Sequence, residues 1–401
     1  MQESERAWLR SLRTAEPRLS LATLFLVDGI GFGAWASHVP AFKQILHLEN
    51  SSLTFVLVSL VVGSLLAMPL TGQMIARFGS RVVIRMVAVT YCASMLLLAQ
   101  SESFVSLILF AGFYGAVKGA LDVSVNAQAF AVEEHYGHSS MSFLQGCWSV
   151  GSLTGAALSG ALLHHNGTVR SDLSLVAAIL ALLCAGALPR LVSDKTPSQR
   201  AAKFVLPDAA LMRLAILAFF GLLVEGAVAD WAPVYLHSDI SATLSMSAAG
   251  YAAYAITMTV TRFCGDAVAR KFSGRRILQA SGLLIAGGVG LVLLSRSYTL
   301  AAVGLMFTGV GTANIVPVIL GAAGRDTRLG PGPAISAVST VGYFGLLAGP
   351  PIIGGIATIA GLRLALSVLA VCGIIVATGA MLLETKLPVK AGDRALQGSE
   401  R

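Results

Sequence analysis

The segment GQMIARFGSRVVI, residues 72–84, connects two apolar stretches through a short basic turn. Residues 265–278, GDAVARKFSGRRIL, repeat this arrangement in the second half of the chain. Each segment has a glycine, three further residues, Ala-Arg and then a basic turn. Weak internal symmetry of this kind is typical of membrane proteins built from two structural repeats.

Two more pairs of segments match in the same order along the chain. DGIGFGAWASHVP (28–40) and EGAVADWAP (225–233) each place an acid and a glycine before a tryptophan and a proline. WSVGSLTG (148–155) is similar to STVGYFGLLAG (339–349). The longest polar break lies between the repeats, so we predict two six-helix bundles and a cytoplasmic linker: residues 1–193, 208–401 and 194–207.

Apolar residues dominate the chain. Hydrophobic residues make up 55% of its 401 residues and charged residues only 12%, whereas soluble proteins carry about 25% charged residues. Helices of about 20 apolar residues cross the hydrocarbon core of a membrane. The sequence predicts twelve such segments: 20–41, 52–76, 81–100, 103–132, 140–165, 172–193, 209–236, 246–269, 276–295, 299–322, 333–359 and 361–384.

The expected fold class is therefore an all-α integral membrane protein with twelve transmembrane helices in two pseudo-symmetric bundles. No room remains for a separate catalytic domain, so we do not expect an enzyme. With the N-terminus inside, Lys and Arg gather in the cytoplasmic segments, as the positive-inside rule requires. The exceptions are Lys43, Arg170, Arg296 and Arg363 on the opposite side and Lys118 and Arg262 within helices.

The net charge of +8 follows from this topology and predicts no nucleic-acid partner. The five cysteines lie in apolar spans without metal-ligand spacing, and we expect neither a metal nor a cofactor. The expected partners are a small-molecule substrate, protons and the lipid bilayer, and we expect a monomer in a bacterial inner membrane with both termini cytoplasmic.

Across nearly its whole length the chain resembles transporters of the major facilitator superfamily. LDVSVNAQ (121–128) followed by MSFLQGCWSVGSLTGAALSG (141–160) is similar to the fucose–proton symporter group and its uncharacterised bacterial relatives. The resemblance implies that Asp122 and Asn126 occupy the positions of an acid and an asparagine on helix 4. In those symporters the acid takes part in proton coupling.

The chain departs from the family pattern at three positions. Ala36 stands where those symporters have an acid on helix 1, and Ala76 and Ala269 replace the acid of the loop motif after helices 2 and 8. Asp266 lies close to the second of these sites. The resemblance therefore implies that the contacts of this loop are weaker or differently built.

A polar face interrupts the apolar fourth segment. Tyr114, Lys118, Asp122 and Asn126 are spaced four apart, so they share one helix face, which we expect to face the central cavity. Lys118 and Asp122 can reach each other at this spacing. Either they are a structural pair, or protonation of Asp122 or a substrate releases Lys118.

Three further acids lie within apolar segments, where ionisable groups are costly and usually functional. Glu225 has no basic residue within a turn and is, with Asp122, a leading proton-carrier candidate. Asp28 is another, with pairing to Lys118 across helices 1 and 4 as the structural alternative. Asp230 is expected in an outer vestibule.

Other polar and aromatic residues are candidates for binding or gating. The predicted binding residues, besides Asp230, are Tyr114, Asn126, Gln145, Trp148, Tyr254, Asn314, Trp35 and Trp231, although the last two are alternatively interfacial anchors. For gating we consider Arg262 with Asp266, as an inner-gate ion pair or a solvated capping pair, and Glu133 with Arg77 or Arg81.

The sequence thus predicts a proton-coupled secondary transporter that works by alternating access and imports a small polar solute, with a sugar-like compound as the first candidate. Proton-driven export of drugs or metabolites is the alternative. A non-transporting membrane sensor is a third reading, for which neither terminus offers a signalling region of useful size.

Overall fold

The computed structural model describes residues 2–48, 50–136, 140–164, 168–192, 208–242, 244–326 and 328–382. The predicted linker at 194–207 lies outside these residues. The longer helices are α1 (Gln2–Ile45), α2 (Asn50–Phe78), α3 (Ser80–Ala99), α4 (Phe104–Tyr136), α5 (Met141–His164), α6 (Val169–Ala187), α7 (Ala209–Ser238), α8 (Leu244–Lys271), α9 (Gly274–Leu294), α10 (Tyr298–Thr312), α11 (Ile315–Gly324), α12 (Pro331–Ala360) and α13 (Leu362–Gly379). Short 3-10 turns at Leu188–Arg190 and Ala380–Leu382 follow α6 and α13.

The helices confirm the all-α membrane fold. In hydrocarbon every backbone polar group must be satisfied internally, which a helix achieves. Ten segments of the described chain are long and apolar enough to span a membrane, and α10 and α11 together form one of them. The remaining two of the twelve expected segments correspond to α5 and α8, which are long enough but carry more polar residues, such as Gln145 on α5 and Arg262 on α8.

Local sequence sets where several helices begin and end. Gly79 and Gly361 separate consecutive helices with φ of 80° and 82°, a conformation that suits glycine because it lacks Cβ. The side chains of Thr168, Asp208 and Ser273 accept hydrogen bonds from the first free amides of α6, α7 and α9. These caps satisfy donors that a helix start otherwise leaves unpaired.

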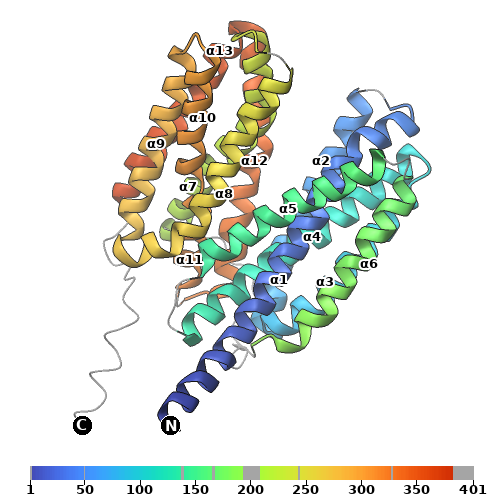
Figure 1. Cartoon of the computed structure of the whole chain (residues 1–401), viewed down its shortest axis with the longest axis vertical. Coiled ribbons are helices and arrows are strands. Elements are labelled where there is room, and N and C mark those ends of the chain that lie inside the picture. The colour runs from blue at the N-terminus through green and yellow to red at the C-terminus, as the bar shows by residue number, and fades with distance from the viewer. Residues whose placement is uncertain are drawn as a thin grey trace. The chain divides into compact units, whose positions relative to one another are not determined.

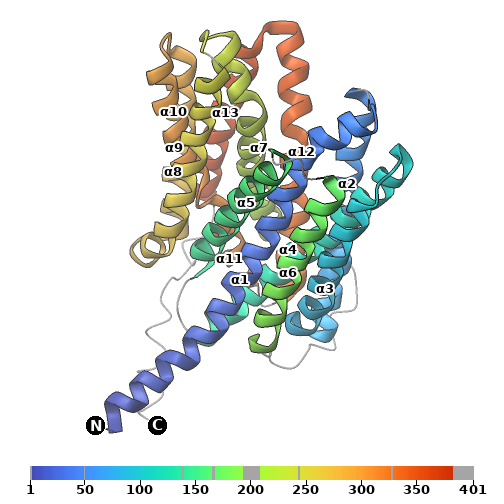
Figure 2. The same cartoon turned by 45° about the vertical axis from the view of Figure 1, so that its right-hand side comes forward.

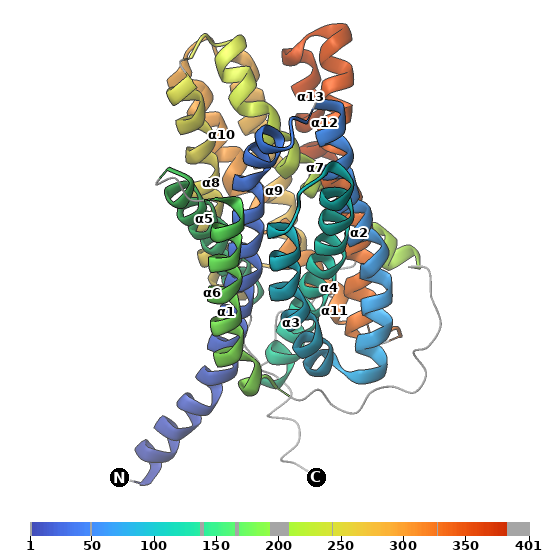
Figure 3. The ribbon, with the colours of Figure 1, turned by 90° about the vertical axis from the view of Figure 1, so that its right-hand side faces the viewer.

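The chain divides into two compact units. The first comprises residues 1–136, 144–205 and 327–336, and the second comprises 137–143, 206–326 and 337–401. In the first unit α4 packs between α2 and α3, and α6 packs on α1 and α3. Figure 3 shows α1 beside α6.

In the second unit α9 packs against α10 and α13, and α10 also packs against α8 (Figures 1 and 2). Helices α10 and α11 are separated by a break at Ala313 and Asn314. The break has a local cause, because Pro317 has no N–H to donate to the carbonyl of Ala313, four residues earlier.

Candidate functional site

Glycines bring α1 and α5 into close contact around Asp28. A Cβ on Gly29 or Gly33 of α1 would overlap the carbonyl oxygens of Trp148 and Ser152, respectively. A Cβ on Gly155 of α5 would likewise overlap the carbonyl of Ile30. Small residues allow helix backbones to approach this closely in membranes, and the approach fixes Trp148 beside Asp28.

Asp28 is fully buried and forms a cross-helix ion pair with Lys118 of α4. The Lys118 Nζ lies 3.1 Å from Asp28 Oδ2, and the indole Nε1 of Trp148 donates to the same oxygen at 2.9 Å. Lys118 Nζ also lies 5.5 Å from the ring centre of Trp148 and 5.8 Å from that of Phe32. The other carboxylate oxygen, Asp28 Oδ1, is buried and has no hydrogen-bond partner within the described chain.

This pair is the structural alternative that the sequence left open. Lys118 reaches across to α1, and Asp122, one turn along α4, interacts electrostatically with both Lys118 and Asp28. The three charged groups therefore form one buried cluster, in which Asp28 and Lys118 are in direct contact.

Two tyrosines, Tyr91 and Tyr114, lie beside this cluster. The Tyr91 hydroxyl donates to the Asp28 carbonyl at 3.0 Å and lies 3.1 Å from the Tyr114 hydroxyl. Trp35 is buried, with its ring centre 5.9 Å from that of Tyr114. The interfacial-anchor interpretation of Trp35 is therefore wrong, because the ring packs inside the helix bundle of the first unit.

Amide side chains extend the polar face of α4. Asn126 Nδ2 donates to the Asp122 carbonyl at 2.8 Å, and its Oδ1 accepts from Gln145 Nε2 of α5 at 3.2 Å. Both amides are buried. The structure thus brings together Asp28, Lys118, Asp122, Asn126, Gln145, Trp148 and Tyr114, which the sequence singled out separately.

The second unit holds its own ion pair, between the half-buried Glu225 of α7 and the buried Arg262 of α8. Arg262 Nη2 lies 3.2 Å from both carboxylate oxygens of Glu225. The Nε of the same arginine donates to the Ala313 carbonyl at 3.2 Å. Because Pro317 cannot donate to that carbonyl, the carbonyl is free to accept from Arg262. Arg262 therefore bridges the carbonyl at the helix break and the Glu225 carboxylate.

Arg262 and Asp266 are both buried, so the solvated capping pair is wrong. Asp266 instead accepts from the backbone amides of Ser142 and Phe143 at 3.1 and 3.0 Å. These are the first amides of α5, which lack partners within their own helix. Asp266 therefore caps the start of α5 in the second unit, close to where Ala269 replaces the family's acid.

The remaining second-unit candidates differ in their surroundings. Tyr254 is buried, bonds Thr312 at 3.1 Å and stacks on Tyr251. Asn314 Oδ1 and Trp231 Nε1 are buried atoms without hydrogen-bond partners in the described residues. Asp230 is exposed, and its place in an outer vestibule stays a prediction.

The predicted pairing of Glu133 with Arg77 or Arg81 stays a prediction. Arg77 is exposed, with its guanidinium 5.2 Å from the ring centre of Phe78. Arg81 is half-buried, and its Nε has no hydrogen-bond partner in the described part of the chain.

Equivalent helix contacts give the register of the internal repeat. A Cβ on Gly151 would meet the carbonyl of Leu26 and the amide of Ile30, and one on Gly349 would meet those of Leu223 and Ala227. In this register Asp28 and Glu225 occupy equivalent positions of the two repeats, as the sequence match suggested.

The first glycines of the opening motifs are equivalent as well. Gly72 lies against Ser336 near the start of α12, and Gly265 lies against Ser142 at the start of α5. The two units thus repeat the same contacts with different partners for the central acid.

Comparisons with known proteins agree with this architecture. The sequence profile of the Major Facilitator Superfamily matches residues 21–328. The chain belongs to this superfamily. An uncharacterised transporter of the same superfamily from Yersinia pestis is 32% identical over 363 residues, covering 90% of this chain and 94% of the relative.

Solved structures of superfamily members share the fold. FucP in its outward conformation gives a TM-score of 0.78 at 14% identity, over 93% of this chain and 99% of FucP. The human organic anion transporter MFSD10 gives 0.76 at 16% identity, over 92% and 99% of the two chains. The chain is therefore a multi-pass membrane transporter of the major facilitator type, rather than an enzyme, with a small-molecule substrate.

The sequence did not predict three features of the site. Tyr91 carried no distinguishing pattern, and the Arg262–Glu225 contact joins residues far apart in the chain. His38 of α1 and Asp172 of α6, a buried pair, had only the weak signal of polar residues in apolar segments. No cluster of three or more His, Cys, Asp or Glu suited to a metal occurs in the described residues.

Proposed function

We propose that the chain is a proton-coupled secondary transporter that imports a small polar solute across a bacterial inner membrane, with both termini in the cytoplasm. The observation that carries the proposal is the buried Asp28–Lys118 pair. A buried ion pair contributes little net stability, and ionisable groups at membrane depth usually mark substrate or ion pathways. The pair is therefore best explained by a role in transport.

Asp28 is the preferred proton acceptor of the first unit. Its Oδ2 holds Lys118 and Trp148, while Oδ1 is the buried oxygen without a partner. A proton on Oδ1 neutralises the carboxylate and removes the charge attraction for Lys118. Asp122 lies at i+4 from Lys118, so the ammonium can then move toward it.

The same residues suit a polar solute. When Lys118 moves, Asp28 and Trp148 lose a neighbour, and the amides of Asn126 and Gln145 lie on the adjacent turns. Carboxylate, indole and amide groups together bind hydroxyl-rich molecules through hydrogen bonds and ring contact. FucP, which shares the fold, is a fucose:proton symporter, and this supports the solute class and the coupling to protons.

In the second unit, Glu225 is the equivalent acid and a second proton candidate. A proton on Glu225 weakens its hold on Arg262, which also binds the carbonyl at the α10–α11 break. We propose that this contact transmits the protonation state to the helix break during alternating access.

The first experiment identifies the solute and its coupling. A thermal-shift screen of sugars, polyols, amino acids, nucleosides, organic anions and drugs selects ligands of the purified protein. Each ligand is then tested in proteoliposomes with an imposed pH gradient and an internal pH dye. We expect accumulation of the solute together with proton entry.

Three results would contradict the proposal. Ligand binding without flux indicates a sensor, and flux that ignores the pH gradient removes proton coupling. Expulsion of solute from right-side-out vesicles, in exchange for protons, indicates export of drugs or metabolites instead.

A further inference from the structure

A second buried acid–base pair lies in the first unit, away from Asp28. His38 is on α1, about 15 Å along the helix from Asp28 at 1.5 Å per residue. Asp172 lies in the first turn of α6. Their side chains are 0% and 2% exposed, with His38 Nε2 3.7 Å from Asp172 Oδ2.

The hydrogen bond of His38 determines which tautomer its neutral ring adopts. Its Nδ1 lies 2.8 Å from the Ala34 carbonyl, and a carbonyl only accepts, so Nδ1 carries a proton. In a neutral imidazole the other nitrogen is then an acceptor. His38 Nε2 therefore presents a lone pair to a carboxylate oxygen.

Neither facing atom has another partner. His38 Nε2 and Asp172 Oδ2 are both buried and make no hydrogen bond to the described residues. Two acceptors facing each other repel, and a buried carboxylate without a counter-charge is costly. One added proton between these atoms removes both problems.

The start of α6 determines where that proton binds. Ser171 Oγ donates to Asp172 Oδ1 at 3.2 Å, and Thr168 and Ser171 form a capping box at the helix start. The N-terminus of a helix favours a negative charge. These contacts stabilise the carboxylate form of Asp172, so the acceptor left for an added proton is His38 Nε2.

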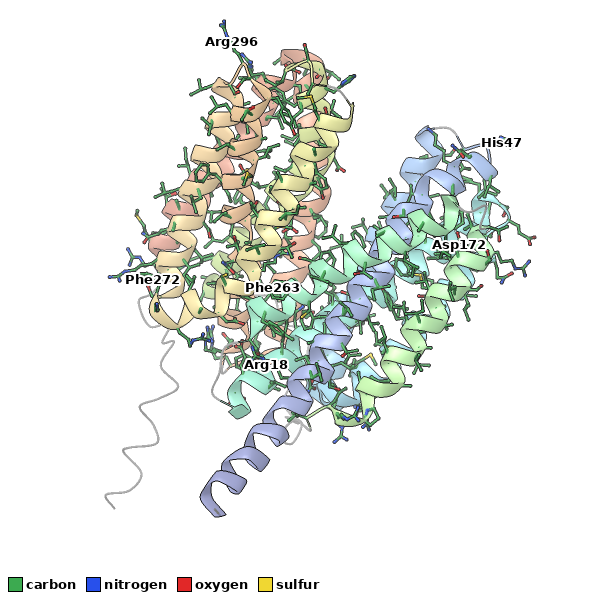
Figure 4. All side chains as sticks on the ribbon, viewed as in Figure 1. Arg18, His47, Asp172, Phe263, Phe272 and Arg296 are labelled. Atoms are coloured by element: carbon green, nitrogen blue, oxygen red, sulfur yellow. The ribbon has the colours of Figure 1, made fainter. Side chains whose placement is uncertain are left out.

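Other charged groups at this end of the first unit do not supply the missing partner. His47, Arg170 and Glu102 are exposed, and Lys43 is half-buried. Figure 4 shows His47 and Asp172 at the same end of this unit. Within the described residues, His38 and Asp172 form an ion pair only with each other.

We propose that His38 and Asp172 form a buried proton-binding site, separate from the Asp28–Lys118 pair, that joins α1 to α6 when occupied. The proton comes from a hydronium ion of the bulk water: its O–H bond breaks, a water molecule is left, and an N–H bond forms at the Nε2 lone pair. The product is an imidazolium–carboxylate pair with no net charge and one new hydrogen bond between the two helices.

Nitrogen NMR of the full-length protein labelled with 15N-histidine tests this site between about pH 5 and 8, the range in which histidines usually titrate. The His38 signals are assigned with His38→Gln. We expect them to change from a neutral ring protonated at Nδ1 to a ring protonated at both nitrogens, with Nε2–H hydrogen-bonded. Asp172→Asn removes the negative charge that faces the ring, so the titration of His38 should move to lower pH.

His47→Gln is the matched control, because it removes an exposed histidine from the same helix end and should leave the His38 signals unchanged. The proposal is overturned if the His38 ring of the wild-type protein keeps a single proton, on Nδ1, throughout this pH range. This outcome is read on wild-type protein and so does not depend on whether Asp172→Asn folds. An Asp172→Asn protein with the wild-type His38 titration overturns it as well. Neither outcome depends on solute transport, so the site fails or stands independently of the proposed function.

Discussion

At the scale of single residues, one proton on Asp28 affects several contacts at once. Its Oδ2 accepts from both Lys118 and Trp148. The sequence identified all three residues, because ionisable and aromatic groups are conspicuous in apolar helices. It could not decide between Asp28 and Asp122 as the partner of Lys118, since the spacing within α4 is visible in a sequence and the register between α1 and α4 is not.

Removing the cation of this pair should destabilise the protein. Lys118→Gln leaves Asp28 buried without its ammonium, and loss of one partner of a buried pair costs about 3–5 kcal/mol. The melting temperature in detergent should therefore fall clearly, whereas Asp28→Asn combined with Lys118→Gln should recover most of the loss. Asp230→Asn, at an exposed acid, should melt as wild type does. Equal melting temperatures for Lys118→Gln and wild type would show that the pair is not formed.

At the scale of elements, helix contacts and breaks depend on a few small residues and prolines. The glycines of GSLTGAALSG (151–160) are plain in the sequence, but the sequence names no contact partner for any of them. The break between α10 and α11 was not predicted, because the carbonyl that Pro317 frees is held by Arg262 from a distant helix.

The close contact of α1 and α5 should not tolerate a methyl group. Gly155→Ala places a Cβ against the Ile30 carbonyl, and overpacking costs about 1–3 kcal/mol. Gly160→Ala, on the same helix with nothing within 4 Å of its Cβ, should be neutral or stabilising by up to about 1 kcal/mol. Melting temperatures of the two variants check this, and similar values for both would contradict the contact.

Restoring the missing donor at the α10–α11 break should straighten the helix. Pro317→Ala supplies an amide that competes with Arg262 for the Ala313 carbonyl. Hydrogen exchange read by mass spectrometry should then show slower exchange across residues 313–318 than in wild type. Ile319→Val, a mild change on the same helix, is the control and should leave exchange there unaltered. Unchanged exchange in Pro317→Ala would show that the break has another cause.

At the scale of the whole chain, the sequence predicted the membrane spans well. The twelve expected segments correspond to the observed helices, and most of their ends agree within a few residues, because the thickness of the hydrocarbon core constrains length and composition together. The repeat was also legible, since acid, glycine and tryptophan recur in order. The sequence offered Lys118 as one alternative partner of Asp28 but named none for Glu225, because the two repeats draw their cations from different helices.

The proposed topology places the two ends of the spans on opposite sides of the membrane. In a variant without its five cysteines, Arg170→Cys and Arg296→Cys should react with a membrane-impermeant maleimide in intact cells. Arg77→Cys and Arg276→Cys should react only after permeabilisation. All four arginines are exposed, so side-chain burial does not separate the pairs. The reverse pattern would place the N-terminus outside.

The most direct test of proton coupling separates exchange from accumulation. In proteoliposomes with the identified solute, Asp28→Asn should still exchange solute across the membrane but should no longer accumulate it when a pH gradient is imposed. Ser124→Ala, at a buried hydroxyl of α4 that bonds only within its own helix, should do both. Asp122→Asn and Glu225→Gln, measured alongside, show whether those acids share the role. If Asp28→Asn accumulates solute as wild type does, Asp28 is not the coupling acid, and if none of the three substitutions reduces accumulation, proton coupling through these buried acids is contradicted.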